Sequence, residues 1–320
     1  MNVGGQAVIE GVMMRSKDRV ATAVRIPNGE ILVKTDPYLA LSNRYKLLNT
    51  PIVRGAVAFV EMLILGIKTL NFSAEIAVDE ADKEEAANNG TEHVPKEKKK
   101  RNAFFLGLSV VLAMAVGIFV FFYLPLLVSS LFNISKDAVA FNLVAGAIRL
   151  TMFVAYVWAI SFFGELRRVF QYHGAEHKSI YAYEMGDELT PDRAALHTRF
   201  HPRCGTSFIL IVALLAILIY AISDTFFTLW AGHPPTLGVR FLVHFSLLPL
   251  VAGTSYELLK LSGKTRDNVV TRTLIKPGLW LQKITTQEPS NDQLEVAIAA
   301  LEAALGITES RLTAKRTAVS

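Results

Sequence analysis

Four long apolar runs in the second two-thirds of the chain constrain its fold more than any other feature. They cover residues 103–130, 139–163, 206–223 and 237–259. A helix needs about 20 apolar residues to cross the hydrocarbon core of a bilayer, and each run is close to that length. Charged residues make up 19% of the chain, below the ~25% of a typical soluble domain, and they cluster between the runs. We therefore predict a mainly α-helical integral membrane protein with about four transmembrane helices.

Lysine and arginine residues are distributed unevenly around these runs. They precede the first run, fill residues 164–205 and follow the fourth run, whereas the other two connections hold only Lys136 and Arg240. Since short cytoplasmic loops carry the excess of positive charge, we expect both termini and the 164–205 segment to be cytoplasmic. The net charge of +5 therefore points to the lipid bilayer as partner and not to nucleic acid.

The first hundred residues divide into three predicted segments. Residues 1–49 form a small cytoplasmic β-containing lobe, with a hairpin of 21–26 and 31–35 around Pro27-Asn28-Gly29 and one further strand within 6–14. Residues 50–78 form an amphipathic helix, interfacial or re-entrant, because Arg54, Glu61 and Lys68 disfavour a full span. Residues 79–102 are predicted to be a charged, disordered linker.

The last segment, 260–320, is predicted to be cytoplasmic and to contain one amphipathic helix. Its apolar residues have helical spacing: Leu294, Ala297, Ile298, Leu301 and Leu305. This face could dock on the N-terminal lobe or on another subunit, so a membrane or cytoplasmic protein partner is also considered. The oligomeric state stays open.

The segment 164–205 holds the residue types that carry chemistry. His173 and His177 are four residues apart, so they share one face of a helix, and Glu176 between them completes an H-x-x-E-H order. Two imidazoles at this spacing suit one transition metal, and a carboxylate beside them suits a general acid or base. We predict His173 and His177 as metal ligands and Glu176 as the catalytic residue.

A second group follows in the same segment. His197 and His201 are again four apart, and Cys204, the only cysteine, lies three residues further on. Imidazole and thiolate both suit zinc, and Glu184 lies on the helical face of His177. The predicted ligand set therefore also includes His197, His201, Cys204 and Glu184, for a divalent transition metal, zinc by preference.

The alternative interpretation is that these histidines are structural, because histidine pairs without a metal are common near membrane interfaces. Structural roles are also expected for two residues inside the apolar runs. Arg149 is expected to extend toward the outer headgroups rather than to pair with a buried acid. His244 is expected to be a hydrogen-bonded core residue.

Three functional hypotheses follow from these residues. The first is a membrane-embedded, metal-dependent enzyme, most simply a hydrolase, with a histidine-rich site facing the cytoplasm. The second is a non-enzymatic transporter or regulator, although a transporter needs polar residues deep in several spans. The third is a scaffold in which the histidines are structural.

Several long motifs resemble one known family. They are GGQAVIEGVMMR, TPIVRGAVAFVEML, YHGAEHKSIYAYE, HPRCGTSF, GTSYELLK and PGLWLQKITTQEP. In these the chain is similar to the YqhQ-like family of bacterial membrane proteins, over nearly its whole length. The resemblance implies a bacterial cell membrane location, a predicted metal-dependent activity without a known substrate, and motif positions for His173, Glu176, His177, His201 and Cys204.

Overall fold

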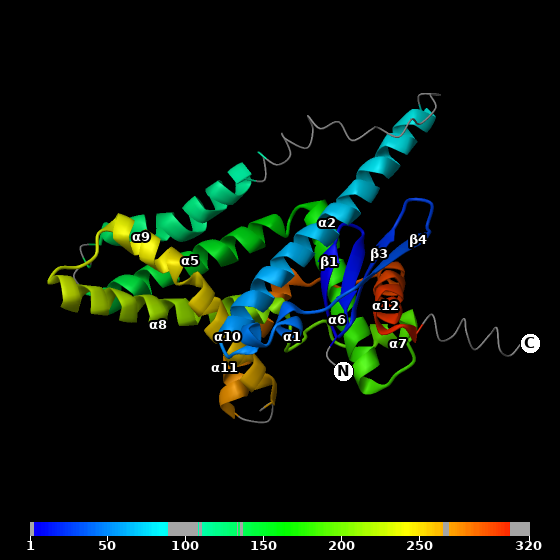
Figure 1. Cartoon of the computed structure of the whole chain (residues 1–320). Helices are drawn as coiled ribbons and strands as arrows, with labels where there is room; N and C mark the ends of the chain where they lie inside the picture. The colour runs from blue at the N-terminus through cyan, green and yellow to red at the C-terminus, as the bar shows by residue number, and fades with distance from the viewer. Residues whose placement is uncertain are drawn as a thin grey trace, which may run out of the picture.

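The computed structural model describes residues 3–88, 108, 111–132, 134, 137–264 and 269–307. These residues form a lobe built on a small sheet and, beside it, a bundle of long apolar helices (Figure 1). The lobe comprises strands β1–β4 with the helices α6 (Gly164–Met185), α7 (Pro191–Ala195) and α12 (Asn291–Leu305). The prediction of a mainly helical chain with a small N-terminal β-containing lobe is confirmed, and the strands of that lobe form an antiparallel sheet.

The sheet is a four-stranded antiparallel meander with the strand order β1-β2-β3-β4. Its strands are β1 (Gly4–Val8), β2 (Gly11–Arg15), β3 (Arg19–Arg25) and β4 (Ile31–Pro37). The predicted hairpin is β3–β4, and Gly29 supplies the positive φ of its turn. The single strand expected within 6–14 is instead the hairpin β1–β2, because the chain reverses at Glu10, whose φ is +50°.

One face of the sheet is covered by α6 and α12. The cross-strand pairs Val12–Ala23 and Met14–Ala21 lie on this face and belong to the buried core of the lobe. From α12 the core receives Leu294, Ala297, Ile298 and Leu301, four of the five residues of the predicted apolar stripe, and Leu305 packs against it. The predicted C-terminal helix thus docks on the lobe of its own chain.

The N-terminal connection is largely helical. After the short α1 (Leu41–Arg44) and the 3-10 turn η1 (Lys46–Asn49), α2 runs unbroken from Val53 to Asn88. This corrects the prediction of a linker from 79, because its first ten residues continue the helix, where Lys83 pairs with Asp79 and Glu80 one turn before it. Residues 89–102 of that predicted linker lie outside the described residues. The continuous α2 also differs from the re-entrant form that was one of the two predictions for residues 50–78.

In the described part of the bundle, three helices are long and apolar enough to cross a membrane, or four if one bent pair forms a single span. The three are Val111–Ser130, α5 (Ala138–Ile160) and the part of α8 (Gly205–Ala231) from Phe208. The bent pair is α9 (Leu237–Ser246) and α10 (Leu248–Lys264), which meet at 47°. The number of predicted spans agrees with this range by length and composition.

Two predicted run boundaries change. The third run continues past 223, because Asp224 is buried among hydrogen-bond donors and so does not end the helix. The first run contains the π-turn η2 (Phe119–Tyr123) before α4 (Leu124–Ser130). Residues 103–107 of that run lie outside the described residues.

The helices α2 and α11 (Val269–Thr285) pack against helices of the bundle. The helix α2 crosses α10 closely, since a Cβ on Gly55 would lie 2.8 Å from the carbonyl oxygen of Gly253. Near this crossing Arg54 and Glu257 form an ion pair. The helix α11 packs against α8 and leads into the segment before α12.

Candidate metal centre

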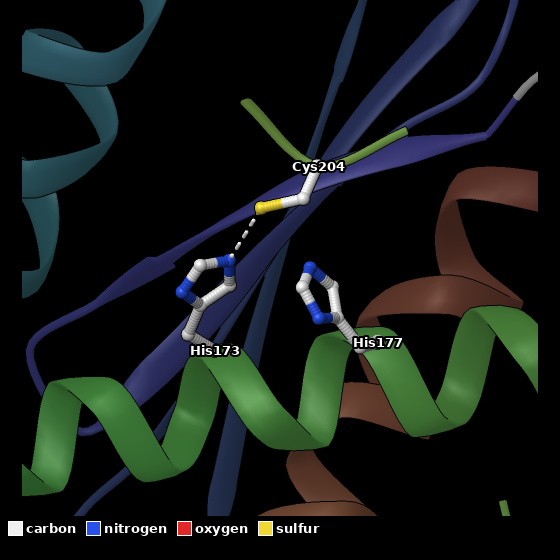
Figure 2. A group of neighbouring side chains, drawn as sticks. All are labelled: His173, His177 and Cys204. Carbon is white, nitrogen blue, oxygen red and sulfur yellow. Dashed lines mark hydrogen bonds between the residues drawn. The ribbon is translucent and has the colours of Figure 1, made fainter. Parts of the chain in front are cut away.

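Three of the predicted ligands meet where the bundle joins the lobe. His173 and His177 project from one face of α6, and Cys204 lies at the N-cap of α8. One ligand atom from each residue lies within 4.8 Å of the other two. In Figure 2 both imidazole rings rise from α6 toward the sulfur of Cys204. Among the described residues this is the group of histidine, cysteine and acidic side chains with metal-binding spacing.

Backbone carbonyls fix how the two imidazoles are protonated. Nδ1 of His173 lies 2.8 Å from the carbonyl oxygen of Thr285, and Nδ1 of His177 lies 2.5 Å from that of Arg199. A carbonyl oxygen can only accept, so each Nδ1 carries the proton and donates it. In the neutral rings both Nε2 atoms therefore keep their lone pairs. Metal-binding histidines are oriented in this way by outer hydrogen bonds.

The sulfur of Cys204 completes the group. It lies 3.2 Å from Nε2 of His173 and 3.2 Å from the hydroxyl of Thr206. The backbone amide of Thr206 also donates to it at 3.5 Å, in the first turn of α8. Negative charge is favoured at a helix N-terminus, so this position suits a thiolate ligand.

A segment far along the chain supports the site from outside. We call residues 285–289 the strap, because they lie along α6. Besides the Thr285 carbonyl, the amide of Gln287 donates to the carbonyl of Phe170 at 2.8 Å. A Cβ on Gly174 would lie 2.1 Å from the carbonyl oxygen of Gln287, so only glycine allows this approach. The buried Lys178 also reaches the strap, where it pairs with Glu288.

Gln282 holds the loop before Cys204. Its side chain is fully buried, accepts a hydrogen bond from the amide of His201 at 2.8 Å and donates to the carbonyl of His201 at 2.9 Å. Arg199 in the same loop donates to the carbonyl of Thr286 at 2.7 Å. The loop and the strap therefore fix each other beside α6.

Glu176 lies beside the group but faces the sheet. It is buried and accepts a hydrogen bond from the backbone of Gly5 in β1. A Cβ on Gly5 would lie 2.9 Å from Cγ of Glu176, so the glycine makes room for the carboxyl group. Burial raises the pKa of Glu176 to about 7, and the neighbouring His173 opposes this rise. Such a pKa is suited to proton transfer near neutral pH.

The other predicted ligands have different partners. His197 lies 2.7 Å from Asp187 and stacks on Tyr181, outside the group. Glu184 pairs with Arg203 and lies 3.7 Å from Nε2 of His201. The His201 ring is buried 5.6 Å from that of His177, between the group and Glu184. The structure thus brings together three of the six predicted ligands, with His201 adjacent.

Polar residues elsewhere near the junction also have partners. Glu10 pairs with Arg168 and lies 3.3 Å from the hydroxyl of Tyr172. Glu61 accepts a hydrogen bond from the amide of Leu41 at 2.8 Å. A groove of about 540 Å³ lies between α5 and α8, no histidine lines it, and its apolar lining fits hydrocarbon rather than a metal. It is therefore not the candidate site.

Sequence reasoning missed the carbonyls of Thr285 and Arg199 and the side chain of Gln282. Every residue has a backbone carbonyl, so the residue type does not reveal which carbonyls will bind the imidazoles. The signal that could have drawn attention to Gln282 and Thr285 was their place in the motif PGLWLQKITTQEP, among otherwise apolar residues.

Comparison with known proteins adds a family but no activity. The model of the family described as "Protein of unknown function (DUF1385)" matches residues 50–307. The chain is 34% identical over 309 residues to the uncharacterized protein YqhQ of Bacillus subtilis (strain 168), covering 92% of this chain and 89% of the relative. No solved structure matches.

Proposed function

Since the chain belongs to the DUF1385 family, whose description assigns no function, we propose from its own residues that it is a membrane protein that binds a divalent transition metal. The ligands are His173, His177 and Cys204. Nitrogen and sulfur ligands together favour zinc over magnesium or calcium. The single observation that carries this proposal is that both Nδ1 atoms donate to carbonyls, which leaves two Nε2 lone pairs beside one sulfur.

The catalytic form of this proposal is a hydrolase. His173, His177 and Cys204 would hold the ion, and a bound zinc ion would supply the Lewis acidity that makes a nucleophilic water easier to deprotonate. Glu176 would hold or move the proton of that water, because its carboxyl group has a pKa of about 7 and lies one turn from His173. The backbone hydrogen bond from Gly5 would hold the carboxyl group in place. The substrate class stays undefined.

A structural metal is the second candidate, favoured by burial. His177 and Cys204 are buried and His173 is partly buried, so little of the group is open to a large substrate. The ligands come from α6 and from the start of α8, which belong to the lobe and the bundle. A metal here would tie the two parts together, with His201 as the residue placed to become a fourth ligand.

The proposed location is a bacterial cell membrane. The apolar helices would cross it, with the lobe, both termini and the metal centre on the cytoplasmic side. The basic residues around the first, second and fourth runs support this orientation. Docking of α12 on its own lobe removes one reason to expect a protein partner there.

Metal analysis of the detergent-purified protein tests the proposal. We expect about one zinc ion per chain in the wild type and a loss of zinc in His173→Ala, His177→Ala and Cys204→Ser. The matched control is His197→Ala, a histidine of the same segment that pairs with Asp187 and should leave the zinc content unchanged. Full zinc retention in the three ligand variants would contradict the site.

A second comparison separates catalysis from structure. Glu176→Gln should keep zinc and fold but fail to restore the phenotype of a strain that lacks the protein. Restoration by Glu176→Gln would exclude the acid-base role. If the protein without zinc also loses the protection of the lobe against protease, the metal is structural.

A further inference from the structure

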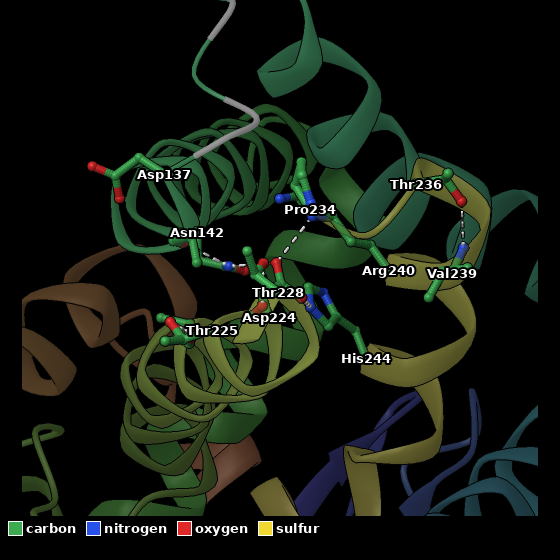
Figure 3. Close-up of polar contacts among 12 residues, drawn as sticks. Asp137, Asn142, Asp224, Thr225, Thr228, Pro234, Thr236, Val239, Arg240 and His244 are labelled. Atoms are coloured by element: carbon green, nitrogen blue, oxygen red, sulfur yellow. Dashed lines mark hydrogen bonds and ion pairs between the residues drawn. The ribbon is translucent and has the colours of Figure 1, made fainter. Parts of the chain in front are cut away.

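A buried polar cluster lies inside the bundle, away from the metal centre (Figure 3). Asp224 of α8 accepts hydrogen bonds from Asn142 at 2.9 Å and from His244 at 3.0 Å, and its carboxylate lies 3.0 Å from Nε of Arg240. All four residues are buried. The carboxylate is therefore fully surrounded by donors, and its charge is balanced by Arg240.

Arg149 of α5 is a second cation in the same region without such balance. Its Nε donates to the carbonyl of Phe121 at 3.0 Å, and its guanidinium lies over the rings of Phe122 and Tyr220. Its Nη2 is buried without a hydrogen-bond partner, and no acidic side chain among the described residues pairs with it. Arg149 therefore pairs with no acid in the part of the chain that the structure describes, and its contacts with Phe121, Phe122 and Tyr220 lie within the bundle.

Unpartnered polar atoms gather around Tyr220. Its hydroxyl is buried without a partner, and so is Nδ1 of His244, within the described residues. The rings of Tyr220 and His244 stack at 4.1 Å, and the Arg149 guanidinium carbon lies 5.9 Å from the Tyr220 ring centre. Buried polar groups without partners are rare in proteins. Here Tyr220 carries one, and its two neighbours Arg149 and His244 carry one each.

Two irregularities of helix geometry border the same residues. The π-turn η2 contains Phe121, whose carbonyl binds Arg149, and Phe122, which contacts the Tyr220 ring edge to face. The break between α9 and α10 falls at Leu247, which packs in the cluster of Tyr220 and Val251. π-turns and broken membrane helices recur at binding sites, because both free backbone groups from regular pairing.

From these observations we propose a binding site for a small monovalent anion between Arg149, Tyr220 and His244. The anion would balance the cation of Arg149 and accept hydrogen bonds from its Nη2 and from the Tyr220 hydroxyl. A cation without a paired acid is costly in a membrane interior, so the charge of the partly buried Arg149 favours an occupant. His244 would donate to it from Nδ1 in its doubly protonated, cationic form, with Nε2 still bonded to Asp224.

The depth of Arg149 excludes a lipid headgroup as this anion. Arg149 lies near the middle of α5, about 16 Å from either end at 1.5 Å per residue. A headgroup phosphate would have to enter the hydrocarbon core to reach it. The expected ligand is therefore a diffusible ion such as chloride or a short carboxylate.

Thermal unfolding of the detergent-purified protein tests this site. Sodium chloride or sodium acetate replaces sodium gluconate, a much bulkier anion, at constant ionic strength. We expect a saturable rise in the apparent Tm of the wild type, with the more effective salt identifying the ion. Arg149→Met should abolish the rise. Tyr220→Phe should raise the half-saturating concentration at least about tenfold, the loss expected for one hydrogen bond to a charged group.

Tyr220→Phe also keeps the proposal testable if Arg149→Met does not fold, because it removes only the unpartnered hydroxyl. The control is Tyr123→Phe, on the same π-turn, which should respond to the salts as the wild type does. A wild type without a saturable rise would overturn the site. So would a Tyr220→Phe protein with an unchanged salt response. All these variants should retain zinc, so failure here is distinguishable from failure of the metal proposal.

Discussion

Nδ1 of His173 donates its proton to the carbonyl oxygen of Thr285, 112 residues further along the chain and 2.8 Å away. This hydrogen bond is one of several that hold the strap against α6. The strap also contacts Phe170 and Lys178 of that helix. The orientation of the metal-facing nitrogen therefore depends on a segment that contributes no ligand.

Gly174→Ala should displace the strap. The added Cβ would lie 2.1 Å from a backbone oxygen, a contact that side-chain rotation cannot relieve. We expect a loss of about 1–3 kcal/mol in stability, typical of overpacking, and weaker zinc binding. Thermal unfolding and zinc content would measure both. The control in the same helix is Gly164→Ala, where the new Cβ meets open space, and equal effects of the two variants would argue against the strap.

Gln282→Leu should loosen the loop that carries His201 and Cys204. It leaves the buried amide and carbonyl of His201 without their side-chain partner, at about 1–3 kcal/mol each. Zinc affinity should fall by about 10–100-fold, as for other outer hydrogen bonds of metal sites. Competition with a fluorescent chelator measures this change. Gln287→Leu, in which the strap keeps its backbone contacts, should bind zinc normally; an equally weak Gln287→Leu would point to a nonspecific effect.

Glu176→Gln should change how stability depends on pH in the metal-free protein. Burial raises the pKa of Glu176 from 4.5 to about 7, so ionisation opposes folding. This cost is absent below pH 4.5, grows as the pH rises, and is complete above pH 7. Relative to the wild type, Glu176→Gln should gain on the order of 2–3 kcal/mol between pH 5 and pH 8. Thermal unfolding in EDTA at both pH values measures it, and a gain independent of pH would contradict the buried carboxyl group.

Labelling of single cysteines should report the orientation in the membrane. In a Cys204→Ser background, cysteine is placed at Asn28 in the β3–β4 turn or at His233 after α8, both exposed positions. A membrane-impermeant maleimide applied to intact cells should label the cysteine at 233 and not the one at 28. After lysis it should label both. Labelling of position 28 in intact cells would place the lobe and the metal centre outside.

The tertiary structure changed the roles that the sequence had suggested for several residues. From the sequence Asp224 ends an apolar run, but in the fold Arg240, His244 and Asn142 solvate it, so α8 continues. His197 and His173 have the same spacing to a second histidine, yet only His173 faces Cys204. Charge and spacing describe a residue along its own helix, whereas its partners come from other segments.

Three features could be predicted from local sequence: the apolar helices, the β3–β4 hairpin and the amphipathic stripe of α12. Each of these follows from hydrophobic length, periodicity or turn chemistry within about 25 neighbouring residues. The fold alone showed which histidines meet Cys204, which carbonyls set their tautomers, and that Arg149 lies over the ring of Tyr220 without an acidic partner among the described residues. Those facts depend on contacts between segments up to 112 residues apart, where packing and hydrogen bonding rather than local pattern select the partner.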